Sequence, residues 1–177
     1  MQINDIDYDL LRLIYLAAQA KAIDPSLVAG LVRKESNFSP AAQGDYEDGT
    51  PQAFGLMQLN VKHGPAAVRA YMNRPTELFD PALNLHLGCD YLRACLNAFP
   101  GDLKAAICAY NAGISRVRAD GWVWNQDRYV LPVLASAAAW REAMRQVAVL
   151  AHVDAVWGKT EEIRGELIAL KRAVGLE

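Results

Sequence analysis

The segment that decides the fold reads Asp24-Pro25-Ser26-Leu27-Val28-Ala29-Gly30-Leu31-Val32-Arg33-Lys34-Glu35-Ser36. It begins with two helix signals, because an aspartate side chain can accept hydrogen bonds from free amides and a proline suits the first helical position. Leu27, Leu31 and Glu35 are spaced four apart, so the carboxyl shares the helix face of the leucines. The segment predicts a helix with an acid on its apolar face.

An acid in this position has two interpretations. Burial disfavours the charged form of a carboxyl and raises its pKa, as a general acid near neutral pH requires. The alternative is a glutamate at a frayed helix end with its carboxylate in water, since charged residues are seldom buried without a partner. The motifs that follow Glu35 favour the first interpretation.

These motifs come in a fixed order. They are Ser36-Asn37-Phe38-Ser39-Pro40, Phe54-Gly55-Leu56-Met57-Gln58-Leu59-Asn60, a predicted helix with Asn84, Gly88 and Tyr91-Leu92, then Phe99-Pro100-Gly101-Asp102 and Ala109-Tyr110-Asn111-Ala112-Gly113. In this order the set resembles the lytic transglycosylase (SLT) domain family, which is related to goose-type lysozyme. The resemblance runs from about Ile23 to about Val133. It implies a lysozyme-like fold in which two helical lobes flank a central cleft.

Composition agrees with a mainly α, globular protein. The 177 residues are 53% hydrophobic and 21% charged, and no apolar run reaches the ~20 residues of a membrane span. The periodicity predicts helices over residues 5–22, 24–36, 65–73, 80–99 and 103–110, a loop with a small hairpin over 39–54, and two C-terminal helices over 127–157 (with a break near Pro132) and 160–174. We expect a catalytic domain at residues 1–135 and a helical extension at 136–177 that packs on it or continues it.

Several functional classes are disfavoured. A formal charge of −2 gives no electrostatic reason to expect nucleic-acid binding. The three cysteines lack paired spacing and the three histidines are scattered, so we expect no metal and no cofactor. Cys89, Cys95 and Cys108 are predicted to fill the core.

The resemblance assigns Glu35 as the catalytic acid and then base. In this family the sugar's own 6-hydroxyl attacks, and the product is a 1,6-anhydro-muramyl end. The residues expected to contact substrate are Ser36, Met57, Gln58, Tyr110, Asn111 and Tyr129. Gly55 lets the backbone approach a sugar closely, and the phenol of Tyr110 is expected to orient the Glu35 carboxyl or the departing oxygen.

A second carboxylate would favour hydrolysis instead. Goose-type lysozymes hydrolyse the same bond, and Asp48 is placed much as an acidic residue in those enzymes is. Asn60 stands where they tend to carry an aspartate, and an amide cannot act as a base. We therefore expect a transglycosylase, with an Asp48-assisted muramidase as the alternative. A non-catalytic wall-binding or virion assembly module is a second alternative.

The expected partner is the glycan strand of peptidoglycan. The N-terminus lacks a basic region followed by an apolar segment, so we expect no signal peptide, synthesis in the cytoplasm, and release or delivery to the wall. A bacteriophage lysis protein, a virion-borne enzyme and a secretion-system accessory all meet this description. The apolar stripe of the last predicted helix (Ile163, Leu167, Leu170 and Val174) suggests self-association or contact with an assembly.

Overall fold

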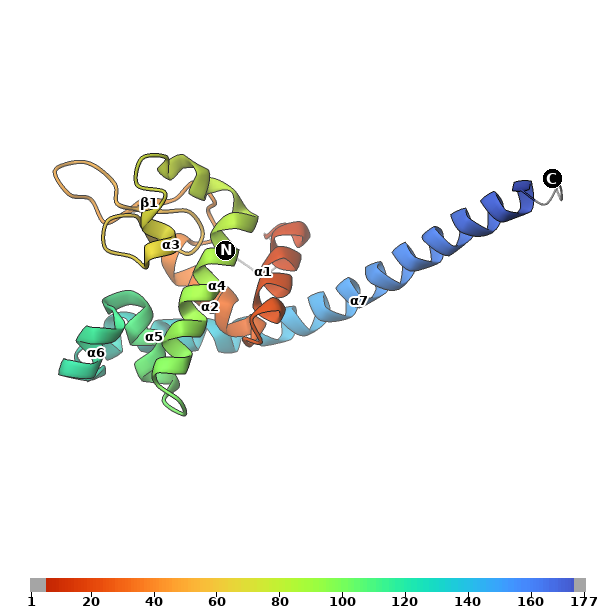
Figure 1. Ribbon diagram of the computed structural model, residues 1–177. Helices are drawn as coiled ribbons and strands as arrows, with labels where there is room; N and C mark the ends of the chain where they lie inside the picture. The colour runs from red at the N-terminus through yellow and green to blue at the C-terminus, as the bar shows by residue number, and fades with distance from the viewer. Residues whose placement is uncertain (1–5, 174–177) are drawn as a thin grey trace.

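The computed structural model describes residues 6–173, with the side chains of residues 6–169, and it consists mainly of helices with one small sheet (Figure 1). The helices are α1 (Tyr8–Ala20), α2 (Pro25–Ser36), α3 (Ala66–Arg69), the 3-10 helix η2 (Pro75–Phe79), α4 (Pro81–Ala98), α5 (Leu103–Ala112), α6 (Ile114–Asp120), the 3-10 turn η3 (Val123–Asn125), the π-helical turn η4 (Gln126–Val130) and α7 (Leu131–Ala173). The mainly α fold class is therefore confirmed.

The sheet has three short antiparallel strands in the order β1-β2-β3. These are β1 (Gln43–Gly44), β2 (Ala53–Phe54) and β3 (Leu59–Asn60), with Phe54 opposite both Gln43 and Leu59. The sheet and α3 form one side of the body, and α5 and α6 lie on the other (Figure 1). The predicted hairpin thus becomes a small three-stranded sheet, which gains β3 from the segment after Gly55.

The helix start signals of the sequence work as expected. The Asp24 carboxylate accepts from the Ser26 amide at 2.8 Å, and Asp80 accepts from the Leu83 amide at 2.7 Å. Each aspartate is followed by a proline at the first helical position, where the missing N–H has no acceptor to lose. These local contacts fix where α2 and α4 begin.

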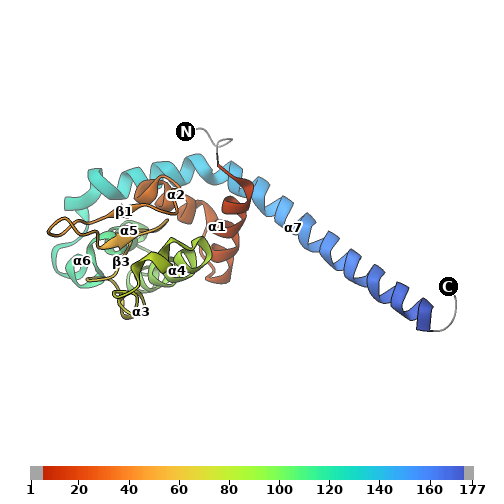
Figure 2. The same cartoon turned by 90° about the horizontal axis from the view of Figure 1, so that it is seen from above.

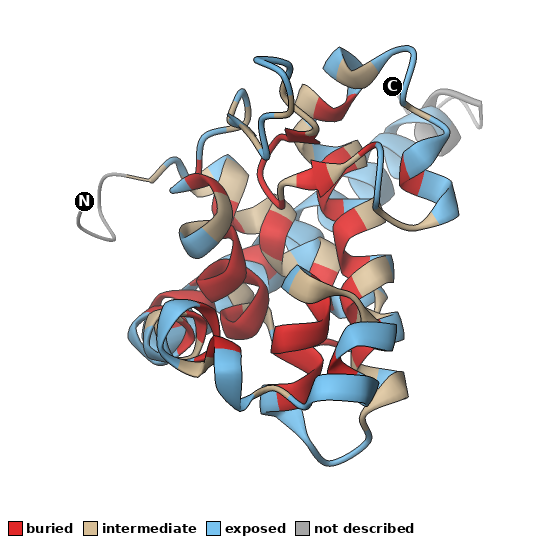
Figure 3. Cartoon of the chain, turned by 90° about the vertical axis from the view of Figure 1, so that its left-hand side faces the viewer, coloured by how far each residue is buried: buried red, intermediate tan, exposed pale blue. Residues whose placement is uncertain are grey.

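The centre of the core is α2, which is buried along most of its length (Figure 3). The first half of α7 packs along it, and α1 contacts both helices (Figure 2). Gly30 permits the close approach of α2 and α7, because a Cβ there would lie 2.6 Å from the Ala137 backbone nitrogen. Cys89, Cys95 and Cys108 are buried in this core, as predicted.

The C-terminal prediction needs correction. Instead of two helices over 127–157 and 160–174, one helix α7 runs from Leu131 to Ala173. Pro132 lies in its first turn, where proline is tolerated, and so it starts the helix rather than interrupting it. Gly158 lowers helix stability by ~1 kcal/mol but does not block the hydrogen-bond ladder. α7 also crosses the predicted division between residues 135 and 136, which stays a prediction.

Within residues 6–173 no helix has the length and apolarity needed to cross a membrane. The same residues contain no group of three or more His, Cys, Asp or Glu arranged to hold a metal ion.

Candidate active site

Glu35 lies in the last turn of α2, on the face that Leu27 and Leu31 bury in the core. Its carboxyl faces a pocket between the sheet and the ends of the helices. The pocket is lined by Glu35, Asp45, Gln58, Leu59, Asn60, His63, Gly64, Pro65, Tyr91, Tyr110, Asn111, Ala112 and Gly113. α2 thus holds the predicted acid at the boundary between core and pocket.

The surroundings of Glu35 raise its pKa to about 7. Burial is the largest cause, because it disfavours the charged form, and the negative charge of Asp45 acts in the same direction. A hydrogen bond from Tyr129 and the charge of Lys34 lower the pKa and oppose this shift. Near neutral pH the group can therefore both donate and accept a proton.

Tyr129 is the residue that holds the Glu35 carboxyl. Its hydroxyl donates to Glu35 Oε1 across 94 positions of sequence. The ring is 4% exposed, and burial together with the Glu35 charge raises the pKa of Tyr129 well above its usual range. Tyr129 lies in η4, the π-helical turn that leads into α7. The phenol therefore keeps its proton and serves as a fixed donor.

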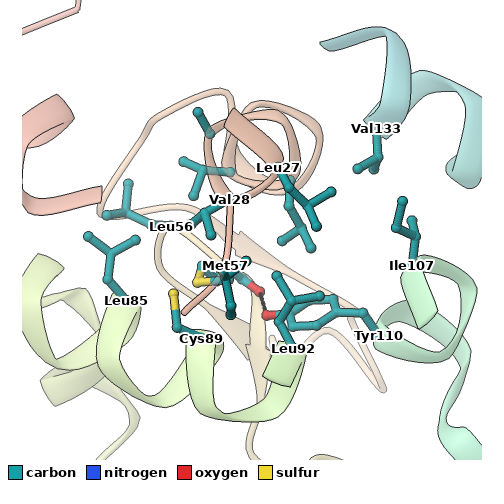
Figure 4. Packing of buried hydrophobic residues seen from close by; sticks show 14 of the residues in the cluster. Leu27, Val28, Leu56, Met57, Leu85, Cys89, Leu92, Ile107, Tyr110 and Val133 are labelled. Atoms are coloured by element: carbon teal, nitrogen blue, oxygen red, sulfur yellow. Dashed lines mark hydrogen bonds between the residues drawn. The ribbon is translucent and has the colours of Figure 1, made fainter. Parts of the chain in front are cut away.

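The sequence-based interpretation gave this task to Tyr110, which the structure corrects. The Tyr110 hydroxyl donates to the Met57 carbonyl oxygen at 2.9 Å, as the dashed line in Figure 4 shows. Its ring lies 5.2 Å from the Tyr91 ring, centroid to centroid. Tyr110 still lines the pocket, but it ties α5 to the turn before β3 rather than to the acid.

The turn at Gly55 to Gln58 is held by Asn84 of α4. The Asn84 amide nitrogen donates to the carbonyls of Phe54 and Leu78, and its oxygen accepts from the Met57 amide at 2.8 Å. Gly55 has a φ of 77°, and a Cβ at this position would lie 2.2 Å from the Asn84 amide nitrogen. This buried network satisfies the backbone of the turn and fixes Gln58 at the pocket.

Gln58 and Asn111, two of the expected substrate contacts, line the pocket, and both amides also bond within the protein. Gln58 Nε2 donates to the carbonyls of Ala42 and Gly55, at 3.1 and 3.0 Å. Asn111 Oδ1 accepts from Asn125 Nδ2 at 3.0 Å. Their side chains are therefore oriented before any sugar is bound.

Three predicted contact residues, Ser36, Met57 and Tyr129, do not line the pocket. Tyr129 holds the Glu35 carboxyl from behind, and the other two support the pocket from inside. The Ser36 hydroxyl is buried and donates to the Val32 carbonyl at 3.1 Å, one helical turn back. The Met57 side chain is fully buried against Gly88, where a Cβ would lie 2.2 Å from its sulfur (Figure 4). Ser36 lies on the core side of α2, and Met57 lies on the core side of the turn from Gly55 to Gln58. Both side chains therefore point away from the pocket.

The acid beside Glu35 is Asp45 and not Asp48. Asp48 is exposed at the far end of the loop and does not line the pocket. Asp45 lines the pocket, and its carboxylate accepts from Asn60 Nδ2 at 3.0 Å. Asp45 and Asp48 lie three positions apart in one loop, and both have left-handed φ values. Sequence position alone therefore did not show which of them faces the pocket.

Comparison with known proteins identifies the family. Residues 12–127 match the family described as Transglycosylase SLT domain, so this chain belongs to that family. It is 34% identical over 120 residues to a membrane-bound lytic murein transglycosylase C of Haemophilus influenzae, and 32% identical over 120 residues to the protein of that name in Mannheimia succiniciproducens. Each match covers 60% of this chain and 32% of the relative, so the chain spans about a third of those proteins.

A solved structure supports the same assignment. The chain resembles the 70 kDa soluble lytic transglycosylase Slt70 of Escherichia coli with a TM-score of 0.58 and 27% identity, over 75% of this chain and 24% of that one. This confirms the lysozyme-like fold that the motifs implied. The relatives named here are bacterial, and the bacteriophage origin stays a prediction.

Proposed function

We propose that this chain is a peptidoglycan lytic transglycosylase that cleaves the β-1,4 bond between N-acetylmuramic acid and N-acetylglucosamine. The observation that carries the proposal is the half-buried Glu35 carboxyl, with a pKa of about 7, at the wall of a pocket in an SLT-family chain. A carboxyl with this pKa suits proton transfer in both directions near neutral pH. The glycan strand is the proposed partner.

The reaction proceeds through two proton transfers at one carboxyl. Protonated Glu35 gives its proton to the glycosidic oxygen, and the bond from that oxygen to the muramyl C1 breaks with oxocarbenium-like character. The carboxylate that remains then takes the proton of the muramyl 6-hydroxyl, whose oxygen bonds to C1. The ring closes as a 1,6-anhydro end, Glu35 regains its proton, and no water is consumed. Tyr129 fixes the carboxyl throughout by its hydrogen bond.

Glu35 acts without a second catalytic carboxylate in this proposal. Asn60 stands across the pocket, and its amide oxygen accepts from the Lys62 and His63 backbone amides while its nitrogen donates to Asp45. The amide cannot take a proton from water. Asp45 instead contributes a negative charge that keeps the pKa of Glu35 high.

Product analysis tests the proposal directly. Purified protein is incubated with cell-wall sacculi, and the released muropeptides are separated by chromatography and weighed by mass spectrometry. We expect anhydro-muropeptides from the wild type and almost none from Glu35→Gln, since the amide cannot donate the proton. Reducing-end muropeptides from the wild type would establish hydrolysis and reject transglycosylation.

A pair of aspartate variants tests the hydrolase alternative. Asp45→Asn should still release anhydro ends, and the loss of its charge should lower the pKa of Glu35, so that activity falls at a lower pH. Asp48→Asn is the matched control on the same loop and should behave as the wild type. Loss of all product with Asp45→Asn at every pH would show that a second carboxylate is needed.

A further inference from the structure

The second half of α7 leaves the body of the protein. The last hydrogen bond and ion pair that join α7 to another element, within the described part of the chain, involve Asp154, whose carboxylate accepts from the Tyr8 hydroxyl at 3.1 Å and lies 3.7 Å from Arg12 Nε. All residues from 155 to 169 are exposed. At 1.5 Å per residue, the helix from residue 155 to its end at Ala173 is about 28 Å long. Figures 1 and 2 show this part of α7 extending away from the other helices.

The two sides of α7 have different surroundings. The side that faces α1 and α2 is buried, with Trp140, Met144, Val147 and Ala151 at 4–8% exposure. Residues two apart on a helix point in nearly opposite directions, about 200° apart, so Val149 lies on the other side. There an apolar stripe, which we call the seam, consists of Val149, Val153, Val156, Thr160, Ile163 and Leu167. Its five apolar members are 41–64% exposed.

The seam has the spacing of a coiled coil. Its members alternate by four and three residues, which is the heptad pattern that keeps one stripe turned toward a partner helix, and the sequence continues it at Leu170 and Val174. The hydroxyl of Thr160, its one polar member, donates to the Val156 carbonyl at 3.0 Å and needs no further partner. The seam therefore fits an apolar helix of the same period.

The helix itself gains from a partner. Isolated helices of this length are marginal in water, and Gly158 and Gly165 each lower helix stability by ~1 kcal/mol. Both glycines lie on the side opposite the seam, and a Cβ at either would meet no atom within 4 Å. Burial of the seam would supply the stability that the exposed helix lacks.

We propose that the seam pairs with the seam of a second copy of this chain in an antiparallel coiled coil. The charged pairs that Lys159 would make favour this orientation. In this register Thr160 of one copy lies opposite Ile163 of the other. Lys159 of one copy then faces Glu166 of the other. Arg164 of one copy faces the Trp157 ring of the other and can form a cation–π contact with it. In a parallel pair Lys159 would face Arg164 one heptad on, which places like charges together.

This arrangement leaves both pockets free. None of the α7 residues whose side chains the structure describes (131–169) lines the pocket, and the seam lies on the side of α7 that faces away from α1 and α2. In an antiparallel pair the two bodies stand at opposite ends of the paired helices. Self-association therefore changes the number of active sites carried by one particle and not the chemistry of each.

Two isoleucine variants of the full chain test the pairing. The mass in solution is measured by light scattering and analytical ultracentrifugation over a concentration series. We expect the wild type to reach twice the mass of one chain, and Ile163→Asp to weaken association at least about tenfold, because it buries an unpaired charge in the seam. Ile168→Asp makes the same change off the seam and should associate as the wild type.

The results of these measurements show whether the seam binds a second copy of the chain or a membrane surface. Equal association of both variants, or a wild type that stays monomeric throughout, would overturn the proposal. A monomer that binds anionic lipid vesicles through the seam, and loses this binding in Ile163→Asp, would assign the seam to a membrane surface instead. Activity on short glycans should be unchanged in both variants, which shows that neither disturbs the body.

A charge exchange tests the orientation. Lys159→Glu places two glutamates opposite each other in the antiparallel pair and should weaken association about three- to tenfold, and the double variant Lys159→Glu with Glu166→Lys should restore it. A parallel pair predicts the reverse for Lys159→Glu, because the new carboxylate would face Arg164. Stronger association of this single variant would reject the antiparallel arrangement.

Discussion

At Glu35, burial in the wall of the pocket links the free energy of unfolding to pH. The folded protein raises the pKa of this carboxyl from 4.5 to about 7, so it binds the proton more tightly than the unfolded chain does. The resulting stabilisation is fully present below pH 4.5 and is lost as pH rises through about 7. The proposed mechanism thus uses a group whose charged form destabilises the fold.

Glu35→Gln removes this linkage. Relative to the wild type, the variant should gain stability as pH rises from 5 to 8, by up to about 3 kcal/mol, the free energy that corresponds to the shift of pKa. Urea unfolding at the two pH values measures the difference. A constant difference between variant and wild type at both pH values would contradict the assignment of a raised pKa to Glu35.

Tyr129 sets the pH range of the same group. Its hydroxyl stabilises the Glu35 carboxylate, so Tyr129→Phe should raise the pKa of Glu35 further and move the alkaline loss of activity above pH 7. The rate below that pH should fall, because the carboxyl is no longer oriented. A pH profile of kcat/KM on a defined glycan measures both effects.

Tyr110→Phe is the matched comparison. It also removes a buried phenol, but that phenol lines the pocket and donates to the Met57 carbonyl. It should lower the free energy of unfolding by roughly 1–3 kcal/mol, because the buried carbonyl loses its donor, and leave the alkaline loss of activity near its wild-type pH. Equal upward shifts in both variants would show that the Tyr129 hydrogen bond does not control the acid.

At the scale of elements, the sequence predicted the features that depend on residues close together in the chain, namely the helix starts and the helix face that carries Glu35. The Asp24-Pro25 and Asp80-Pro81 signals placed the starts of α2 and α4, because capping involves atoms only a few positions apart. The spacing of Leu31 and Glu35 placed the acid at the edge of the core for the same reason.

Long-range contacts were not predictable in this way. The bond from Tyr129 to Glu35 depends on how η4 meets α2, and the resemblance named Tyr129 only as a substrate contact. The choice of Asp45 over Asp48 depends on the backbone path of a loop. The continuity of α7 through Gly158 depends on the helix hydrogen bonds on both sides, which outweigh one unfavourable residue.

Gly30 gives a test at the contact of α2 and α7. A Cβ there would lie 2.6 Å from the Ala137 nitrogen and 2.8 Å from the Val133 oxygen, and backbone atoms cannot move without shifting α7. Gly30→Ala should therefore lower the free energy of unfolding by about 1–3 kcal/mol, although alanine is the better helix former. It should also lower kcat, since η4 and Tyr129 precede α7 directly.

Gly165→Ala is the control for this prediction. The added methyl group meets no atom within 4 Å, so this variant should raise the helix content and leave the body as stable as before. Denaturant unfolding and far-ultraviolet circular dichroism of the two variants give the comparison. If Gly30→Ala were as stable as the wild type, α2 and α7 would not approach as closely as described.

At the scale of the whole molecule, the family match and the folding unit differ in extent. The match ends at residue 127, before α7 begins at Leu131, yet α7 supplies core residues to the body. The Trp140 ring lies 4.7 Å from the Phe38 ring, which is buried three positions after Glu35. The first half of α7 is therefore part of the catalytic body, and the second half is separate from it.

Two truncations test this division. A chain that ends after Val130 exposes the face of α2 beside Gly30 and leaves Phe38 uncovered, so it should fail to fold cooperatively. A chain that ends after Trp157 keeps Trp140, Met144 and the Asp154 contacts, and its free energy of unfolding should match that of the full chain within about 0.5 kcal/mol in dilute solution. Circular dichroism and urea unfolding of both chains measure these effects.

The dependence of Tm on protein concentration gives a second test with the chain that ends after Trp157. Association stabilises a folded chain by mass action, so the full chain should show a Tm that rises with protein concentration. The chain that ends after Trp157 lacks the second half of the seam (Thr160, Ile163 and Leu167), and its Tm should stay constant while it keeps its activity on short glycans. A truncated chain with a lower Tm even at high dilution would show that the second half of α7 packs on the body, and would place its apolar stripe in the core instead of between two copies.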